Sequence, residues 1–388
     1  MKTHHHFKGP EGQEDMPYLL TPGPHTTSQS VKIAMLADYG SRDGEFEGIV
    51  ADICRHLLAI AGGTGDHACV LMQGPGTFGI EAALGSFAPD RRRKTLVVMN
   101  GAGGRRAAQI LARLGRPYVA IDKGDDAAPG ADELGVMLDS DRTISHVFLV
   151  HCETSSGMVN PVKELAAACK MRGKTVLVDA VSSFGALAAS LSADGIDVLV
   201  TSPDKCLEGV PGFSAVICGH ALLEASAGKS HSLALDLEAQ WRAFESTGQF
   251  RFTPPTHAIV AFQQALREFD AEGGIAARLL RCRKNAAALL KGMRAMGFAP
   301  LLPDAQAGPV IQAFHMPRDP RFRFEAFRTS LREQGFAISP GELLAAPSFR
   351  IGTIGRIDGT VIAAALAAIA ATLANLGVHD LGAQDPAP

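Results

Sequence analysis

Two polar residues with complementary chemistry stand where short, apolar, strand-like segments end. Asp179 closes the segment 175–179, and Lys205 follows the segment 198–201 after a brief polar turn. A lysine amine can hold a carbonyl cofactor as a Schiff base, and an acid can keep a pyridine nitrogen protonated. The pair therefore matches what pyridoxal phosphate chemistry requires. An ordinary strand-end acid and a surface lysine would give the same pattern.

A glycine-rich turn supplies a second candidate site. Residues 74–79 have the spacing G-x-G-x-x-G, follow a strand-like segment and open a predicted helix, so that free N–H groups would face an anion. A dinucleotide fold needs an acid about 20 positions later, yet the next strand ends in Met99 and Asn100. A cradle for one phosphate, using Gly76 and Thr77, fits better. Glycines that serve only helix packing would look the same.

Other polar positions lie among apolar ones. Residues 153–157 follow a strand, and a hydroxyl there, such as that of Thr154, could hydrogen-bond a cofactor ring oxygen. His151 and Cys152 suggest a thiol with its base, but adjacent strand residues point to opposite faces. Arg350 interrupts an apolar strand, which predicts either a grip on a carboxylate or phosphonate or an internal salt bridge.

The composition narrows the classes of function. The 388 residues are 46% hydrophobic and 20% charged, and the net charge is −3 without a basic block. This argues against nucleic acid or an anionic membrane as a partner. Seven cysteines without C-x-x-C spacing indicate a reducing compartment and no zinc site, and the polar start lacks a signal core. We expect a cytoplasmic protein, with the apolar run 361–376 as a packed helix rather than a membrane span.

Alternating strand and helix patterns indicate an α/β fold with a mainly parallel sheet. The predicted strands are 69–72, 95–99, 118–121, 146–151, 175–179, 198–201 and 215–218. The predicted helices are 28–37, 78–85, 105–114, 131–138, 162–171, 186–191, 255–269 and 275–297. The pattern then becomes mixed, with strands near 310–316, 337–339 and 349–352 and a helix at 325–334. We predict a disordered leader (1–17), a large domain (18–274), a small α+β domain (275–378) and a tail (379–388).

Taken together, these motifs give the chain a family resemblance. It resembles the class V aminotransferases among the fold-type I pyridoxal phosphate enzymes, over about residues 18–376. Within that class it is similar to the 2-aminoethylphosphonate–pyruvate transaminases. The resemblance is carried by Thr21-Pro22-Gly23-Pro24, Gly76-Thr77, Glu153-Thr154-Ser155-Ser156-Gly157, Val178-Asp179-Ala180, the segment from Ser202 to Phe213 around Lys205, Lys229-Ser230-His231-Ser232-Leu233, Arg251-Phe252-Thr253-Pro254-Pro255-Thr256-His257 and Phe349-Arg350-Ile351-Gly352.

The resemblance implies a role for each motif. Lys205 would hold pyridoxal 5'-phosphate and move a proton, and Asp179 would pair with its ring nitrogen. Thr253 and Thr256 would reach the phosphate from the other subunit of a homodimer whose active sites lie at the subunit interface. Arg350 would bind the carboxylate of pyruvate or alanine, with Pro22 and Gly23 in the substrate loop. The reaction would convert 2-aminoethylphosphonate and pyruvate to phosphonoacetaldehyde and L-alanine.

Two positions depart from the family pattern. Gly103 stands where the pattern has a tyrosine expected to stack on the cofactor, and Pro75 replaces a serine. Both changes predict a weaker grip on the cofactor and a larger space beside its ring, unless Phe78 or His151 compensates. Other readings therefore stay open: an alanine–glyoxylate, serine–pyruvate or related aminophosphonate transaminase, a nicotinamide dehydrogenase, or a non-catalytic member of the class.

Overall fold

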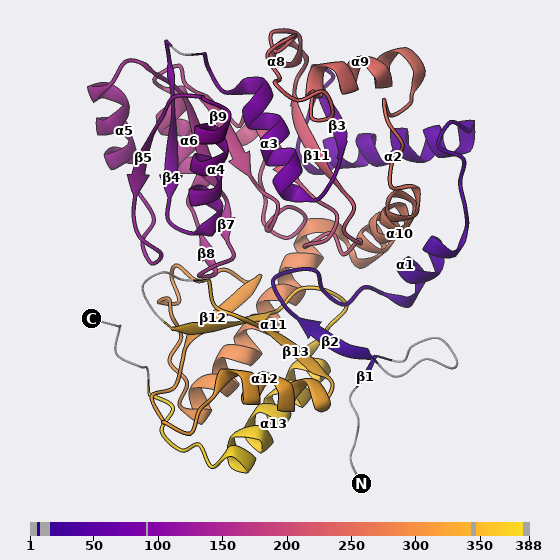
Figure 1. The fold of residues 1–388 in the computed structure, drawn as a ribbon. Helices are drawn as coiled ribbons and strands as arrows, with labels where there is room; N and C mark the ends of the chain where they lie inside the picture. Colours follow the sequence, from indigo (N-terminus) through magenta and orange to yellow (C-terminus); the bar gives the residue numbers. More distant parts are fainter. Residues whose placement is uncertain (1–5, 8–15, 91, 343–346, 383–388) are drawn as a thin grey trace.

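The chain folds around two large β-sheets, which occupy the upper and lower halves of Figure 1, and a small two-stranded sheet lies apart from them. The structure is a computed structural model that describes residues 6–7, 16–90, 92–342 and 347–382. Most of the predicted leader and the end of the predicted tail, from residue 383, lie outside the described residues. Within them, the upper half holds the seven-stranded sheet and the lower half the five-stranded one.

The larger sheet is parallel except for one strand, as the sequence predicts. In spatial order its strands are β3 (His67–Gln73), β11 (Phe213–Gly219), β10 (Val198–Thr201), β9 (Thr175–Asp179), β6 (Ile144–Val150), β4 (Lys94–Met99) and β5 (Tyr118–Asp122). β11 runs antiparallel to both of its neighbours. The central strands are almost wholly apolar because helices cover both faces of the sheet. All seven predicted strands are confirmed.

Two layers of helices enclose this sheet. One face is covered by α2 (Gly44–Ile60), α5 (Ala131–Ser140), α6 (Val162–Lys170) and α10 (Thr256–Glu272). The other is covered by α3 (Gly76–Phe87), α4 (Ala102–Arg113) and α9 (Leu237–Thr247). Successive strand residues alternate between the two cores: Leu71 packs into the first and Val70 into the second.

The smaller sheet combines the start of the chain with its end. Its strands, in order, are β1 (His6–Phe7), β2 (Met16–Leu20), β13 (Phe336–Pro340), β14 (Ser348–Gly352) and β12 (Ile311–His315). The helices α11 (Gly274–Met296), α12 (Phe324–Glu333) and α13 (Gly359–Leu376) pack beside it. β2 begins inside the predicted leader and pairs with β13, so the start of the chain joins the smaller sheet. The domain limits themselves stay a prediction.

Short elements complete the chain. They are α1 (Gln29–Ile33), the 3₁₀ turn η1 (Ala34–Leu36), β7 (Cys152–Glu153), β8 (Met158–Val159), α7 (Leu191–Asp194) and α8 (His220–Glu224). Ser28 caps α1 by accepting from the Val31 N–H, where the sequence predicts a helix start. The predicted helix over 186–191 is wrong. Ser190 caps the backbone at Ala193, and α7 starts only at Leu191.

The most apolar helix is α13. Among the described residues it is the one helix long and apolar enough to cross a membrane. Its buried residues, including Ile362, Ile369 and Leu373, belong instead to the phenylalanine-rich core of the smaller sheet. One face of α13 thus packs into this core, as the sequence predicts for a packed terminal helix.

Candidate active site

Asp179 and Lys205, the two residues that the sequence predicts to hold the cofactor, lie in one cavity. β9 and β10 are parallel neighbours, with Val200 opposite Asp179, and the turn after β10 carries Lys205 to the same edge. The cavity has a volume of about 220 Å³. Eight of the ten predicted site residues line it: Pro22, Gly23, Gly76, Thr77, Thr154, Asp179, Lys205 and Arg350. They come from both halves of the molecule.

Lys205 enters the cavity as half of an ion pair. Its Nζ lies 2.7 Å from Asp204 Oδ2, and the Ser202 hydroxyl donates to the other oxygen of Asp204 at 2.7 Å. Burial raises the pKa of Asp204, but the Lys205 ammonium and the Ser202 hydroxyl outweigh it and hold that pKa below its ordinary value. Asp204 thus stays ionised and anchors the amine. No sequence pattern singles out Asp204 as the anchor, and its position directly before Lys205 is the signal that could have found it.

Asp179 is a buried acid that is only partly hydrogen-bonded. Its side chain is 4% exposed, and Oδ1 accepts from the Val181 N–H at 3.0 Å. Burial raises the pKa of Asp179, against the opposing effects of Arg106 and Lys205. A carboxyl group with a raised pKa is well matched to share a proton with a pyridine nitrogen. Arg106, another cavity residue that the sequence analysis missed, comes from the first turns of α4.

The glycine-rich turn forms an anion cradle at the start of α3. This helix begins at Gly76, and Pro75 caps it without a side-chain hydrogen bond, so the first N–H groups face the cavity with the positive end of the helix dipole. A Cβ on Gly76 would lie 2.7 Å from Val181 Cγ2, too close for any side chain. Asn100 does not offer a ribose contact, because its buried amide donates to Asn160 at 2.7 Å. The cradle fits a single phosphate.

Arg350 reaches the cavity from β14 of the smaller sheet. Its side chain is 4% exposed. Nε donates to the Pro340 carbonyl at 2.9 Å, Nη1 to the Thr154 carbonyl at 3.0 Å, and Nη2 lies 2.8 Å from Glu342 Oε1. Two backbone carbonyls thereby fix the plane of the guanidinium. The third partner, Glu342, comes from the rim and was not predicted.

The substrate loop passes directly over the lysine. Gly23 adopts φ +127°, which side-chain-bearing residues rarely tolerate, and a Cβ there would collide with Nζ and Cδ of Lys205. Glycine is therefore required at this position, and the backbone of the loop stands close to the reactive amine.

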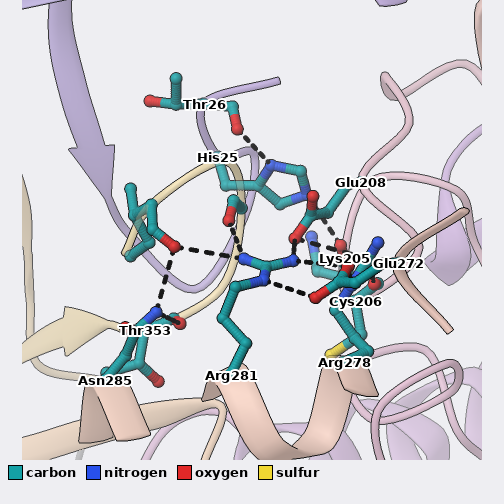
Figure 2. A network of polar contacts seen from close by, with 12 residues as sticks. His25, Thr26, Lys205, Cys206, Glu208, Glu272, Arg278, Arg281, Asn285 and Thr353 are labelled. Atoms are coloured by element: carbon teal, nitrogen blue, oxygen red, sulfur yellow. Dashed lines mark hydrogen bonds and ion pairs between the residues drawn. The ribbon is translucent and has the colours of Figure 1, made fainter. Parts of the chain in front are cut away.

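Behind the cavity, a histidine holds the backbone of the catalytic turn (Figure 2). His25 Nε2 lies 2.7 Å from the Lys205 carbonyl oxygen, and Nδ1 lies 3.2 Å from the Thr26 carbonyl. Burial lowers the pKa of His25, although Glu208 opposes this. The neutral ring then donates its Nε2 proton to Lys205. His25 therefore fixes the turn rather than the amine.

The same turn is clamped by a buried network of charges (Figure 2). Arg278, 1% exposed, contacts Glu272 at 2.7 Å, Glu208 at 3.4 Å and the Cys206 carbonyl. Arg281 contacts Glu208 at 2.5 Å and Glu272 at 2.7 Å. Glu208 has φ +60°, and among the described residues no other non-glycine has a positive φ. The network thus ties the strained turn after β10 to α11 of the lower half.

Some predicted features are not brought together. Thr253 and Thr256 lie outside the cavity of their own chain, just before and at the start of α10, and Thr253 is exposed. His151 and Cys152 form no dyad, as their adjacent positions predict: the His151 ring pairs with Ser183 at 2.9 Å, and burial raises the pKa of Cys152 to about 12. The thiol therefore stays protonated.

The glycine at position 103 lies inside the helix start rather than on the cavity wall. Gly103 and Gly104 donate their N–H groups to the Glu153 carboxylate at 3.0 and 2.9 Å. A Cβ on Gly103 would lie 3.1 Å from both oxygens of Glu153 and from Val150. A side chain at position 103 would therefore press on Glu153 and Val150, and the larger space beside the cofactor ring stays a prediction.

The cavity and the fold together define a pyridoxal phosphate enzyme. A half-buried amine, a buried acid with a raised pKa and an open helix N-terminus are the three anchors that this cofactor uses. Residues 52–369 match the family model described as "Aminotransferase class-V". The chain belongs to this family, and pyridoxal phosphate is its cofactor.

Individual proteins give a more specific comparison than the family model does. The chain is 50% identical over 363 residues to "2-aminoethylphosphonate--pyruvate transaminase" of Rhizobium meliloti (strain 1021), covering 93% of this chain and 94% of that protein. It is 48% identical to "2-aminoethylphosphonate--pyruvate transaminase 1" of Paraburkholderia xenovorans (strain LB400), covering 93% of each. The solved structure of pyridoxamine-pyruvate aminotransferase from Mesorhizobium loti superposes with a TM-score of 0.85 at 24% identity, over 98% of this chain and 95% of that one. At that identity the likeness shows a common fold.

Proposed function

We propose that the protein transfers the amino group of 2-aminoethylphosphonate to pyruvate, giving phosphonoacetaldehyde and L-alanine. The observation that carries the proposal is the 50% identity, over 93% of the chain, to a relative named for this reaction. The chemistry of the cavity agrees with it. One half-buried amine, one buried acid and two arginines suit a reaction between an anionic amine and an anionic keto acid.

Each polar group of the cavity has a task in this reaction. Bound pyridoxal phosphate supplies an electron sink for the carbon next to the substrate nitrogen. Asp179 would keep a proton on the ring nitrogen, and Gly76 and Thr77 would hold the phosphate through their N–H groups and the Thr77 hydroxyl. The Lys205 amine would take up and return the proton of the substrate carbon that carries the nitrogen. Asp204 and His25 keep that amine and its backbone in place.

Two arginines divide the anionic substrate groups. Arg350 binds the pyruvate carboxylate, since its guanidinium is oriented by two backbone carbonyls and is nearly buried. Arg106 is the other arginine of the cavity and lies on α4, which makes it our candidate for the phosphonate. Pro22 and Gly23 close the cavity beside Lys205.

We also propose that two copies of the chain form the active enzyme. Thr253 and Thr256 lie outside the cavity of their own chain, which supports a role for them in the cavity of a partner subunit. Large apolar side chains, including Leu36 (81% exposed) and Phe78 (48% exposed), are available for such an interface. Light scattering of the purified protein tests whether it is a dimer. Thr256→Ala is expected to weaken cofactor binding while the protein remains a dimer.

The reaction is tested in two halves. 2-Aminoethylphosphonate alone should remove the visible absorbance band of the cofactor-loaded protein, and pyruvate should restore it while alanine accumulates. Lys205→Ala serves as the control in which neither change occurs. A protein whose band responds to another amine but not to 2-aminoethylphosphonate would refute the proposed donor and leave the family assignment intact.

A further inference from the structure

Arg350 is neutralised by a carboxylate that stands where a substrate carboxylate would bind. The six charged residues lining the cavity are Arg106, Asp179, Asp204, Lys205, Glu342 and Arg350. Asp204 pairs with Lys205 at 2.7 Å, and Glu342 pairs with Arg350 at 2.8 Å. Two of the three contacts of Arg350 are backbone carbonyls, and Glu342 is the charged one. The most direct binding position for an incoming carboxylate is thus already taken.

The two partners of this pair differ sharply in burial. The Arg350 side chain is 4% exposed, whereas the Glu342 side chain is 53% exposed. A buried cation without an anion is costly, so Arg350 needs a negative partner at all times. A half-exposed glutamate gains little from the pair, because water solvates it well when it leaves. A substrate carboxylate can therefore replace Glu342 at a small cost and preserve the charge balance.

The proposed reaction gives this exchange a purpose, and the inference rests on that reaction. The donor carries a phosphonate and no carboxylate, whereas the acceptor carries a carboxylate, and both must use the same cavity in turn. We propose that Glu342 is a specificity-determining residue. It covers Arg350 while the amine donor is bound, and it gives way to the carboxylate of the keto acid. While in place, it also repels the phosphonate dianion from Arg350 and leaves Arg106 as its partner.

Equilibrium binding of pyruvate tests the exchange. Without an amine donor, pyruvate binds the cofactor-loaded protein but is not converted, so calorimetry measures its affinity. Glu342→Gln removes the competing charge, and we expect pyruvate and acetate to bind about three- to tenfold more tightly. Glu325→Gln, which removes an exposed carboxylate paired with Arg328 on α12, is the matched control and should change nothing. In an Arg350→Gln background, Glu342→Gln should no longer improve binding.

The outcomes separate this inference from the proposed function. Unchanged or weaker binding of both carboxylates to Glu342→Gln, or a gain that survives in the Arg350→Gln background, would overturn the role of Glu342. The absorbance response to 2-aminoethylphosphonate is measured on the same preparations. If that response is missing while Glu342→Gln still tightens pyruvate binding, the proposed donor falls and the exchange at Arg350 stands for a different amine.

Discussion

The two sides of the Lys205 turn use charged residues in opposite ways. In the network behind the turn, Arg278 and Arg281 each contact both Glu208 and Glu272. In the cavity in front of it, the charges are held more loosely. Asp179 has one backbone donor on Oδ1, and the partner of Arg350 is a half-exposed glutamate.

This difference shows how the chain separates position from chemistry. A buried charge whose bonds are complete cannot exchange partners cheaply, so it fixes geometry. A charge with an incomplete set of partners keeps the capacity to bind a ligand or share a proton. Because His25 and the network hold the backbone of the turn, the amine in front can change its partner while the turn stays in place.

The largest expected effect comes from removing the cavity amine. Lys205→Ala should lower amino transfer by at least about 10³-fold, because the variant has neither the covalent anchor nor the proton-moving group. Its fold should persist, since no residue of the network is touched. Coupled alanine production and a thermal melt measure the two quantities. A variant that transfers at the normal rate would show that another group performs these steps.

Removing a charged residue of the network should lower the stability of the fold rather than remove a group that takes part in the chemistry. Arg278→Met leaves Glu208 and Glu272 with fewer partners, and the free energy of unfolding should fall by about 3–5 kcal/mol. Arg283→Met, at an exposed position on the same helix α11, is the matched control and should stay within about 0.5 kcal/mol. Urea titrations compare them. Equal stability of the two variants would contradict the clamping role of the network.

Asp179→Asn should lower amino transfer without lowering the stability of the fold. Transfer should fall by about 10²–10⁴-fold, because an amide cannot hold a proton on the ring nitrogen. Stability should be unchanged or greater at pH 7. Burial raises the pKa of Asp179 above its unfolded value, so the native acid binds its proton more tightly, and ionising it costs stability as the pH rises. Destabilisation of the variant at pH 7 would show that the carboxylate supports the fold.

The sequence predicts the cavity better than the network. Asp179 and Lys205 could be placed because parallel strands end at one edge, and eight of the ten predicted residues do line one cavity. Arg278 and Arg281 look like surface residues of an amphipathic helix until α11 is docked on the turn after β10. No local pattern encodes that docking. Helix α2 was missed, and Glu342 could not be paired with Arg350 without the register of β13 and β14.

The smallest effect concerns His151, a buried histidine that contacts the backbone of the cavity residue Asp179. The His151 N–H donates to the Asp179 carbonyl at 2.8 Å, and its ring pairs with Ser183. Burial lowers the pKa of His151 to about 4 from its model-peptide value of 6.5. The unfolded chain therefore binds the proton first as the pH falls, so stability should drop between about pH 6.5 and pH 4, by roughly 3 kcal/mol.

His151→Gln should remove that component of the acid sensitivity and keep a hydrogen bond to Ser183. Part of the sensitivity should remain, because burial also lowers the pKa of His146 to about 4. Urea unfolding of both proteins at pH 7 and pH 5 measures the difference. A profile as steep in the variant as in the parent would show that His151 is not the sensitive group. The acid sensitivity would then belong to other buried histidines, such as His146 or His25, whose pKa values burial also lowers.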